Sequence, residues 1–516
     1  MKRPMIVIAT IFITGVAFGL LSGERTFILT ITAISVMTGM LIVRPVWRNM
    51  ALLVVVFLLV GIYAGVSQKH KETFIHYLDN DILELEEIAF LDARILEVYR
   101  SKHPRVSYRA EITGVRLEYG GITKLTRGQV LLNIYEPDGS MDLINLGEKI
   151  EIHDFVLQEN LLKNTSNTYY KYLQNQGMSA ILNTDPQHIQ FTSGSRLNPA
   201  NAASKTKVSM QRFIGQHLDP PESTVLKSIM LGNQGYLSDD LRRIFSRTGT
   251  AHIIAVSGLH TGIIAMAAHE LTKIAGVGIR KGKWFTLAIV WFYALIAGLP
   301  VSILRAGTMI TLLILSFFLK RHYDSRNALM IAAMIFIAIN PYTLKTVSFQ
   351  LSFLATASII WGLSLCKNTL KLKYNNKAWN LLTISILVQM GTWPVVAYHF
   401  NELSIISPVS NLLIVPVLGL LMTATLGAWL LNWIPFLADF LMHTVNGMLI
   451  YMIRAMTFLA EKPYAAIRIE KMSLTMVLLY YLFVLVVLGT VLKIESIKEL
   501  IRVKFNDKSG GDLSGL

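Results

Sequence analysis

The polar side chains that could do chemistry are concentrated in one apolar segment, residues 248–262. If this segment is a helix, His252, Val256 and His260 share a face at spacings of four, and Ser257 lies three residues before His260. Polar groups at bilayer depth are costly, and an ionised one at a helix centre costs at least about 2.5–3.5 kcal/mol, so those present are candidates for function. The serine and histidine could line a pore or hold a substrate. They could equally form an interhelical hydrogen-bond cluster that only fixes packing.

Several later apolar runs also carry polar side chains: Arg305, Ser348, Gln350, Ser352, His399, Asn411, His443 and Arg454. Arg305 follows a turn at Pro300, and an arginine at that place either lines a polar cavity or extends its charged end to the surface. The run 405–431 contains Pro408, Asn411 and Pro416. These residues predict a broken helix, which a membrane tolerates only where it is buried in protein or faces water. Polar and broken helices in one bundle favour a conduit over a simple anchor.

An intramembrane serine hydrolase is an alternative interpretation of the same residues. Nucleophilic catalysis needs a serine and its base within about 2.6–3.2 Å. Ser257 lacks the first glycine of a nucleophile motif, and His260 is too close in sequence to be a natural partner, which leaves His399 on another run. A metalloprotease is disfavoured because His269-Glu270 lacks the second histidine of H-E-x-x-H. We therefore expect no catalytic residue in this chain.

An amphipathic segment, 238–248, precedes the 248–262 segment. Ser238 is a good N-cap, and two aspartates suit the first helical turn. The basic residues lie off the apolar face: Arg242, Arg243 and Arg247. The pattern predicts a helix at the outer membrane interface, whose arginines contact lipid headgroups or the phosphates of a polyanion.

The composition is that of a membrane protein. Of the 516 residues, 53% are hydrophobic and only 16% are charged, against about 25% charged in ordinary soluble domains. This balance argues against a purely soluble protein and excludes a disordered one. The single cysteine, Cys366, excludes an intrachain disulfide and a cysteine-rich zinc site, and we expect no metal or cofactor.

The apolar runs predict about 12 membrane spans, because roughly 20 apolar residues cross the hydrocarbon core. Three runs open the chain, the first as a retained signal-anchor: 5–22, 26–43 and 49–66. Nine more follow residue 222: 251–270, 284–300, 303–319, 327–340, 347–365, 379–400, 405–431, 437–460 and 472–492. The run near Pro300 marks a tight hairpin or a broken helix.

The net charge of +15 is unevenly distributed along the chain. Residues 67–222 carry −3, and the rest of the chain carries +18. With twelve spans the basic clusters fall on one side, and basic loops stay cytoplasmic. The charge therefore predicts an inner-membrane protein with both termini cytoplasmic and residues 67–222 outside. It marks topology more than affinity for DNA.

The insert at 67–222 contains alternating strand patterns: 93–99, 106–119, 129–135, 149–157 and 178–182. A short helix is expected near 168–175. Short strands and tight turns fit a small β-barrel of the OB type. Three tyrosines could stack on bases or pack the barrel, and the charge of −3 favours packing: Tyr108, Tyr119 and Tyr135.

Four motifs occur in the order found in the ComEC family of competence proteins, which this chain resembles. They are Ala255–His260 within Thr248–Gly262, Leu304-Arg305-Ala306, Ser348–Phe353, and Asn411-Leu412-Leu413 to Pro416. The resemblance implies an inner-membrane channel that passes single-stranded DNA into the cytoplasm during natural transformation, with an OB-like outer domain. It also implies a periplasmic DNA-receptor protein and a cytoplasmic ATPase or helicase as partners.

The chain departs from many family members, which carry a C-terminal metallo-β-lactamase-like domain. Few residues follow the last predicted span and no His-x-His pair occurs, so we expect no nuclease here. No G-x-x-x-x-G-K-[ST] segment supplies a motor, so energy must come from a partner or a gradient.

The sequence thus predicts a mainly α polytopic membrane protein with an inserted OB-like β-barrel outside the membrane. The predicted parts are three N-terminal spans (1–66), the outer domain (67–222), the channel domain (223–492) and a basic cytoplasmic tail (493–516). The groups expected to line the DNA path are Ser257, His260, Arg305, Gln350, Ser352 and Asn411. A transporter of another anionic polymer or of a lipid-linked substrate is the alternative.

Overall fold

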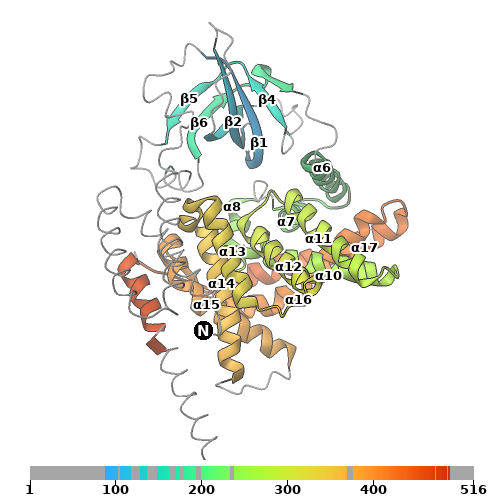
Figure 1. Cartoon of the computed structure of the whole chain (residues 1–516), viewed down its shortest axis with the longest axis vertical. Coiled ribbons are helices and arrows are strands. Elements are labelled where there is room, and N and C mark those ends of the chain that lie inside the picture. Colours follow the sequence, from blue (N-terminus) through green and yellow to red (C-terminus); the bar gives the residue numbers. More distant parts are fainter. Residues whose placement is uncertain are drawn as a thin grey trace, which may run out of the picture.

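A computed structural model describes most of the chain from residue 88 onward. The described residues are 88–102, 105–117, 128–135, 144, 148–161, 170, 173, 178–192, 199–232, 237–368, 376–470, 472–484 and 486–487. The three predicted N-terminal spans and the tail at 493–516 lie outside them. In the described part, a β-sheet lies at one end of the molecule and a body of helices at the other (Figure 1).

The sheet has seven strands in the order β5-β6-β3-β2-β1-β4-β7. They are β1 (Ile88–Lys102), β2 (Arg105–Leu117), β3 (Gly128–Tyr135), β4 (Lys149–Ile152), β5 (Val156–Asn160), β6 (Met178–Thr184) and β7 (Ile189–Thr192). Neighbouring strands are antiparallel except β3 and β6, which are parallel. All five predicted strands are present, but residues 149–157 form two strands because 153–155 leave the ladder. Most of the expected helix near 168–175 lies outside the described residues.

The predicted closed barrel is not confirmed, because the sheet remains open with β5 and β7 at its edges. β4 and β5 are consecutive in sequence yet lie on opposite sides of the strand order. Only residues 153–155 join them, too few to cross a flat sheet, so the sheet curls and brings its two ends close together without a ladder that closes it. The parallel pair is reinforced by Asn133, whose Nδ2 donates to Asn183 Oδ1 at 2.8 Å.

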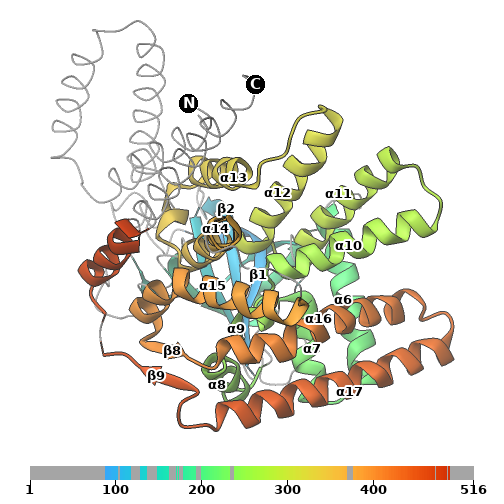
Figure 2. The ribbon, with the colours of Figure 1, turned by 90° about the horizontal axis from the view of Figure 1, so that it is seen from below.

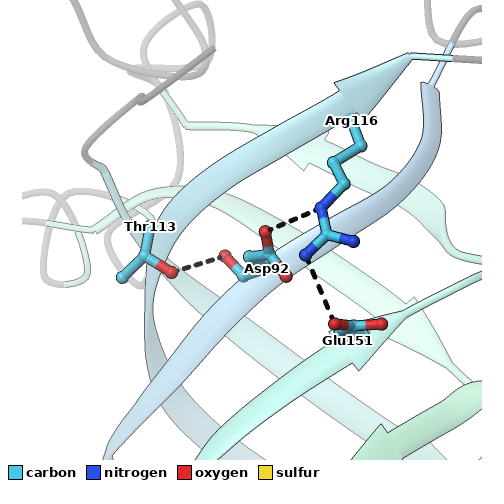
Figure 3. A network of polar contacts seen from close by, with 4 residues as sticks. All are labelled: Asp92, Thr113, Arg116 and Glu151. Carbon is cyan, nitrogen blue, oxygen red and sulfur yellow. Dashed lines mark hydrogen bonds and ion pairs between the residues drawn. The ribbon is translucent and has the colours of Figure 1, made fainter. Parts of the chain in front are cut away.

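A polar network on the sheet surface joins β1, β2 and β4 (Figure 3). Arg116 on β2 lies 3.4 Å from both the Asp92 carboxylate on β1 and the Glu151 carboxylate on β4. Its guanidinium also lies 4.5 Å from the ring centre of Phe90. Thr113 Oγ1 donates to the Asp92 carbonyl at 3.2 Å. Because the arginine side chain is 41% exposed, these ion pairs set the alignment of the strands more than their stability.

The tyrosines proposed to stack on bases differ in their exposure to solvent. Tyr108 is buried in the sheet core, and its hydroxyl accepts a hydrogen bond from the Ile144 N–H at 3.2 Å. It therefore packs the domain and cannot stack on a ligand. Tyr135 is 53% exposed and stays a candidate, and Tyr119 lies outside the described residues.

The helical body begins with α6, which lies within the range assigned to the outer domain. Its helices are α6 (Pro199–His217), α7 (Glu222–Leu231), α8 (Asp239–Arg247), α9 (Ala251–Ile254), α10 (Gly258–Ile274), α11 (Ile279–Ile296), α12 (Val301–Phe318), α13 (Ser325–Ile339), α14 (Val347–Asn368), α15 (Lys377–Phe400), α16 (Ser407–Leu430) and α17 (Pro435–Ala460). A short ribbon of β8 (Glu402–Ser404) and β9 (Ala466–Arg468) joins α15 to the segment after α17. A further helix covers residues 474–484. Seen from below, α14 is viewed along its axis, whereas α17 lies lengthwise across the view (Figure 2).

Five of the described helices are long and apolar enough to cross a membrane: α12, α14, α15, α16 and α17. The expected number of about 12 spans is therefore not confirmed. α13 has 15 residues and is about 23 Å long, which is short of the hydrocarbon core. α11 has three basic residues in its first turns, Arg280, Lys281 and Lys283. The turn at Pro300 is a tight hairpin, since Pro300 is the N-cap of α12 directly after α11.

The predicted break within 405–431 is wrong, because α16 runs without interruption from Ser407 to Leu430. Pro408 lies in the first turn, where a backbone N–H has no helical acceptor to lose. Pro416 lies inside the helix. The interruption occurs elsewhere, at residues 255–257 between α9 and α10.

Contacts of α6 also conflict with the sides assigned from charge. That assignment places residues 67–222 outside and the α16–α17 connection in the cytoplasm. The structure brings the two together: Trp429 Nε1 donates to Ser209 Oγ at 3.4 Å, and His217 Nε2 lies 3.2 Å from Asp439 Oδ1. At least one of the two assignments is therefore wrong. The assignment depends on alternating spans, and several described helices are too short to be spans.

Candidate functional site

The 248–262 segment is two helices separated by an extended turn, not one helix. Thr248 and Gly249 form a turn, and α9 ends at Ile254. Ala255 and Ser257 have extended backbone conformations, with ψ angles of 118° and 175°. The predicted common face of His252, Val256 and His260 therefore does not form, and Ser257 becomes the N-cap of α10.

The interruption brings Ser257 and His260 together. Ser257 Oγ lies 2.9 Å from His260 Nδ1, and the Ser257 backbone N–H donates to the same nitrogen at 3.2 Å. This is the arrangement of a capping box, with a histidine at the third helical position. Because Nδ1 accepts a proton donor, the neutral ring carries its hydrogen on Nε2. His260 is fully buried. Its Nε2 makes no hydrogen bond of regular geometry among the described residues, but the backbone carbonyl of Ile253 lies close enough to interact with the ring. The two residues, although close in sequence, are therefore hydrogen-bonded to each other.

Arg305 on α12 reaches the same place. Its Nη1 donates to the carbonyl of Ser352 on α14 at 2.7 Å, so the backbone of Ser352, not its hydroxyl, makes the contact. A Cβ atom added to Gly258 would lie 2.7 Å from Arg305 Nη2. The guanidinium therefore lies against the first residue of α10. The arginine is only 8% exposed, and its Nε has no hydrogen-bond partner among the described residues.

These residues form what we call the α10 cluster: Ser257, Gly258, His260, Arg305 and Ser352. A further bond fixes the interruption itself, because Ser302 Oγ on α12 donates to the Val256 carbonyl at 2.8 Å. The cluster combines the N-terminus of a helix, which is the positive end of the helix dipole, with a buried cation and a buried imidazole N–H. Such a set of donors suits an anionic group with several acceptor oxygens.

Two of the predicted path residues lie in separate contacts. Gln350 Nε2 donates to the Leu344 carbonyl at 3.1 Å, and its Oε1 lies 3.2 Å from His399 Nε2 on α15. Asn411 on α16 contacts the hydroxyls of Ser385 and Ser407 at 3.4 and 3.5 Å. The structure therefore brings together Ser257, His260, Arg305 and Ser352, but not Gln350 or Asn411.

The three arginines of α8 have different surroundings. The helix itself is as predicted, with Ser238 Oγ accepting from the Leu241 N–H at 3.3 Å. Arg247 Nε donates to the Ala460 carbonyl at 3.0 Å, and its Nη2 donates to the Lys462 carbonyl at 3.4 Å. It thus caps the end of α17. Arg243 is exposed and Arg242 half-buried, so Arg243 is the member best placed to contact phosphates.

Other residues reveal what sequence reasoning missed. Gln389 lies within an apolar helix, and its Nε2 donates to the Ser404 carbonyl at 2.6 Å, which ties α15 to β8. An amide inside an apolar run was the available signal. Gly258 follows a serine N-cap, but its close approach to Arg305 depends on tertiary packing. His443 and Arg454 are exposed. Among the described residues, no three His, Cys, Asp or Glu side chains are placed to hold a metal ion.

Comparison with known proteins identifies the family. Residues 229–493 match the family model described as Competence protein. The chain belongs to the competence protein family. This is the ComEC family that the ordered motifs resemble, and the match includes the whole α10 cluster.

Two of the relatives have descriptive names. ComE operon protein 3 of Bacillus subtilis is 26% identical over 44% of this chain and 30% of its own length. Recombination protein 2 of Haemophilus influenzae is 24% identical over 38% of this chain and 27% of its own length. The match thus spans under a third of either relative. An uncharacterized protein of Aquifex aeolicus is 30% identical over 36% of this chain and 42% of its own length. No solved structure matches the chain.

Proposed function

We propose that this competence family member forms a channel that passes single-stranded DNA across the bacterial inner membrane during natural transformation. Family membership and five apolar helices of spanning length support a membrane protein with this role. The strand order supports an outer domain related to the OB type. The basic loops favour cytoplasmic termini, and α6 is then excluded from the outer domain because it contacts α16 and α17. A periplasmic DNA receptor and a cytoplasmic ATPase or helicase are the partners that the family implies, and we assign no catalytic activity to this chain.

The observation that carries the proposal is the α10 cluster. Arg305 is buried and its Nε–H has no partner among the described residues, and the buried His260 Nε2 makes no hydrogen bond of regular geometry there. A buried donor without a partner costs about 1–3 kcal/mol, so such groups persist where a ligand uses them. The phosphodiester backbone offers charged acceptor oxygens, and hydrogen bonds to charged groups are about twice as strong as neutral ones. A passing strand would therefore be held briefly at the start of α10.

The test uses a naturally transformable host whose own copy is deleted and replaced by variants. Arg305→Ala and His260→Ala should each lower transformation by purified DNA at least about tenfold. Each variant loses one charge-assisted hydrogen bond to the DNA backbone, and a loss of that size corresponds to about a factor of ten. DNA should still reach the outer compartment, as measured by labelled DNA protected from nuclease. Arg454→Ala removes an exposed arginine from α17 and serves as the control. Normal transformation by both cluster variants, at unchanged protein abundance, would contradict the assignment of this chain as a DNA channel.

The deletion strain separates DNA from other cargo. Loss of transformation with retained outer-compartment DNA supports a DNA channel. Full transformation in the deletion strain would favour a transporter of another anionic polymer or of a lipid-linked substrate.

A serine hydrolase is the second candidate, because Ser257 Oγ and His260 Nδ1 are within the distance that nucleophilic catalysis requires. Two features oppose it. Nδ1 already accepts the Ser257 backbone N–H, which occupies the lone pair a general base needs. Among the described residues no carboxylate bonds Nε2, so the ring lacks the partner that orients the histidine of a catalytic triad. Labelling of the wild type, but not of Ser257→Ala, by a fluorophosphonate would establish the hydrolase instead.

A further inference from the structure

A cavity of about 460 Å³ lies between α6 and the end of α16, at a site distinct from the α10 cluster. Four polar residues of α6 line it at spacings of four, three and four: Lys205, Ser209, Arg212 and Gln216. They therefore occupy one face of the helix. Trp429 and Asn432 line the opposite side, and the Trp429 indole N–H donates to Ser209 Oγ at 3.4 Å.

The cavity is basic. Among the described residues its lining includes Lys205 and Arg212 and no acidic side chain. The carboxylate of Asp439 lies close by, but it pairs with His217 at 3.2 Å, one turn beyond Arg212. The serine, glutamine and asparagine add neutral donors around the two cations. This combination suits a phosphate group.

Exposed aromatic residues follow the cavity-lining Asn432 along the chain. Trp433 is 78% exposed, Phe436 is 82% exposed and Phe440 is 62% exposed. Trp433 follows Asn432 in the connection into α17, and Phe436 and Phe440 lie in the first two turns of α17. α16 itself is long and apolar enough to cross a membrane. Exposed aromatic residues beside the end of an apolar helix are typical of the membrane–water interface.

We propose that this cavity binds the phosphate headgroup of an anionic phospholipid, with the acyl chains lying against the exposed aromatic residues. Lys205 and Arg212 contact the phosphate, and Trp429 forms the wall between headgroup and membrane. Basic pockets beside membrane helices are known to hold anionic lipid headgroups. A nucleic-acid strand would satisfy the cations but would leave the apolar side of the site against water, so the lipid is favoured. The site goes beyond the proposed channel and does not depend on it.

The test uses the full chain purified in detergent and incorporated into phosphatidylcholine nanodiscs, with or without phosphatidylglycerol. Native mass spectrometry counts retained phosphatidylglycerol molecules, and titration gives the apparent affinity. Lys205→Gln with Arg212→Gln should weaken phosphatidylglycerol binding roughly ten- to thirtyfold, because each basic residue near anionic lipid contributes measurably to affinity. Both residues are exposed, so the fold is retained.

The control removes the same charge from another part of the helical body. Arg321→Gln with Lys377→Gln changes two exposed residues that do not line the cavity, and it should retain the wild-type affinity. Equal binding by all three proteins would overturn the site. So would binding of a short oligothymidylate that depends on Lys205 and Arg212 while phosphatidylglycerol binding does not.

Discussion

The guanidinium of Arg305 occupies the space that a side chain on Gly258 would fill. A Cβ atom on that glycine would lie 2.7 Å from Arg305 Nη2, closer than real Cβ atoms approach another heavy atom. Gly258 is the first residue of α10, directly after the Ser257 N-cap. The absence of a side chain at one position therefore lets a buried cation from α12 lie at the start of another helix.

Gly258→Ala tests this contact. Nη2 is the end of a flexible side chain, so we expect the arginine to move while the backbone stays in place. Transformation should fall at least about tenfold, with protein abundance unchanged, because a hydrogen bond to a charged group is worth about 1.5–3 kcal/mol. Gly262→Ala is the matched control, since a Cβ there meets nothing within 4 Å. Equal activity of the two variants would show that the position of Arg305 does not matter.

Gly249→Ala tests the packing of the 248–250 turn against α16. Gly249 has a φ of 71°, and a Cβ there would lie 2.5 Å from Ser407 Cβ. Gly276 has a φ of 66° with nothing within 4 Å, so Gly276→Ala has the same backbone strain without the collision. We expect a loss of about 1 kcal/mol for Gly276→Ala and about 2–4 kcal/mol for Gly249→Ala, measured by thermal melting in detergent. Similar melting temperatures would mean that the turn and α16 separate easily.

Arg247→Gln separates a structural arginine from a ligand contact. Arg247 donates to the carbonyls of Ala460 and Lys462 at the end of α17, so its loss should lower stability by about 1–3 kcal/mol. Arg243→Gln changes an exposed residue and should alter stability by less than about 0.5 kcal/mol. DNA uptake is measured for the same variant. If Arg243→Gln weakens DNA uptake while stability is unchanged, α8 contacts the DNA strand as predicted.

The Gln350–His399 contact should appear in a double-mutant cycle. The two side chains are 3.2 Å apart on α14 and α15. Gln350→Ala, His399→Ala and the double variant should give an interaction energy of about 0.5–1.5 kcal/mol in thermal or denaturant unfolding. Additive effects would show that each residue acts alone.

Lys227 on α7 provides a test by pH. Burial lowers the pKa of this lysine below its ordinary value, because the charged form loses hydration. The folded state therefore binds fewer protons than the unfolded state between the two pKa values, and stability rises with pH through that interval. Lys227→Met should raise the melting temperature at neutral pH and reduce this rise on the alkaline side. A parallel pH profile for wild type and variant would contradict the burial of the charge.

Local patterns predicted the strands and α8 well, because alternation and N-capping depend on neighbouring residues. The prolines of α16 led to the wrong prediction of a broken helix. Pro408 lies in the first turn, which needs no N–H donor, and Pro416 is accommodated within the helix. The interruption before Ser257 could not be predicted, because contacts from α12 fix it: Ser302 holds the Val256 carbonyl, and Arg305 lies against Gly258.

The same distinction applies to the site. Arg305, His260 and Ser257 could be chosen from the sequence as polar groups in apolar runs. Ser352 contacts Arg305 through its backbone carbonyl, a group that every residue has. The serine side chain therefore did not indicate this contact in the sequence. Gln350 and Asn411 are bound to neighbouring helices, and only tertiary structure distinguishes these contacts from the α10 cluster.

The parallel pairing of β3 with β6 determines the order in which the sheet can assemble. β1, β2 and β3 are joined by short connections, whereas Asn133 and Asn183 are 50 residues apart. Closing a long loop costs more entropy than closing a hairpin, so contacts of high sequence separation form later. We expect the β1–β2–β3 meander to form first and to wait with the outer edges of β1 and β3 unpaired, because β4 and β6 join them only across long sequence separations. Unpaired edges of this kind are exposed to mispairing during synthesis.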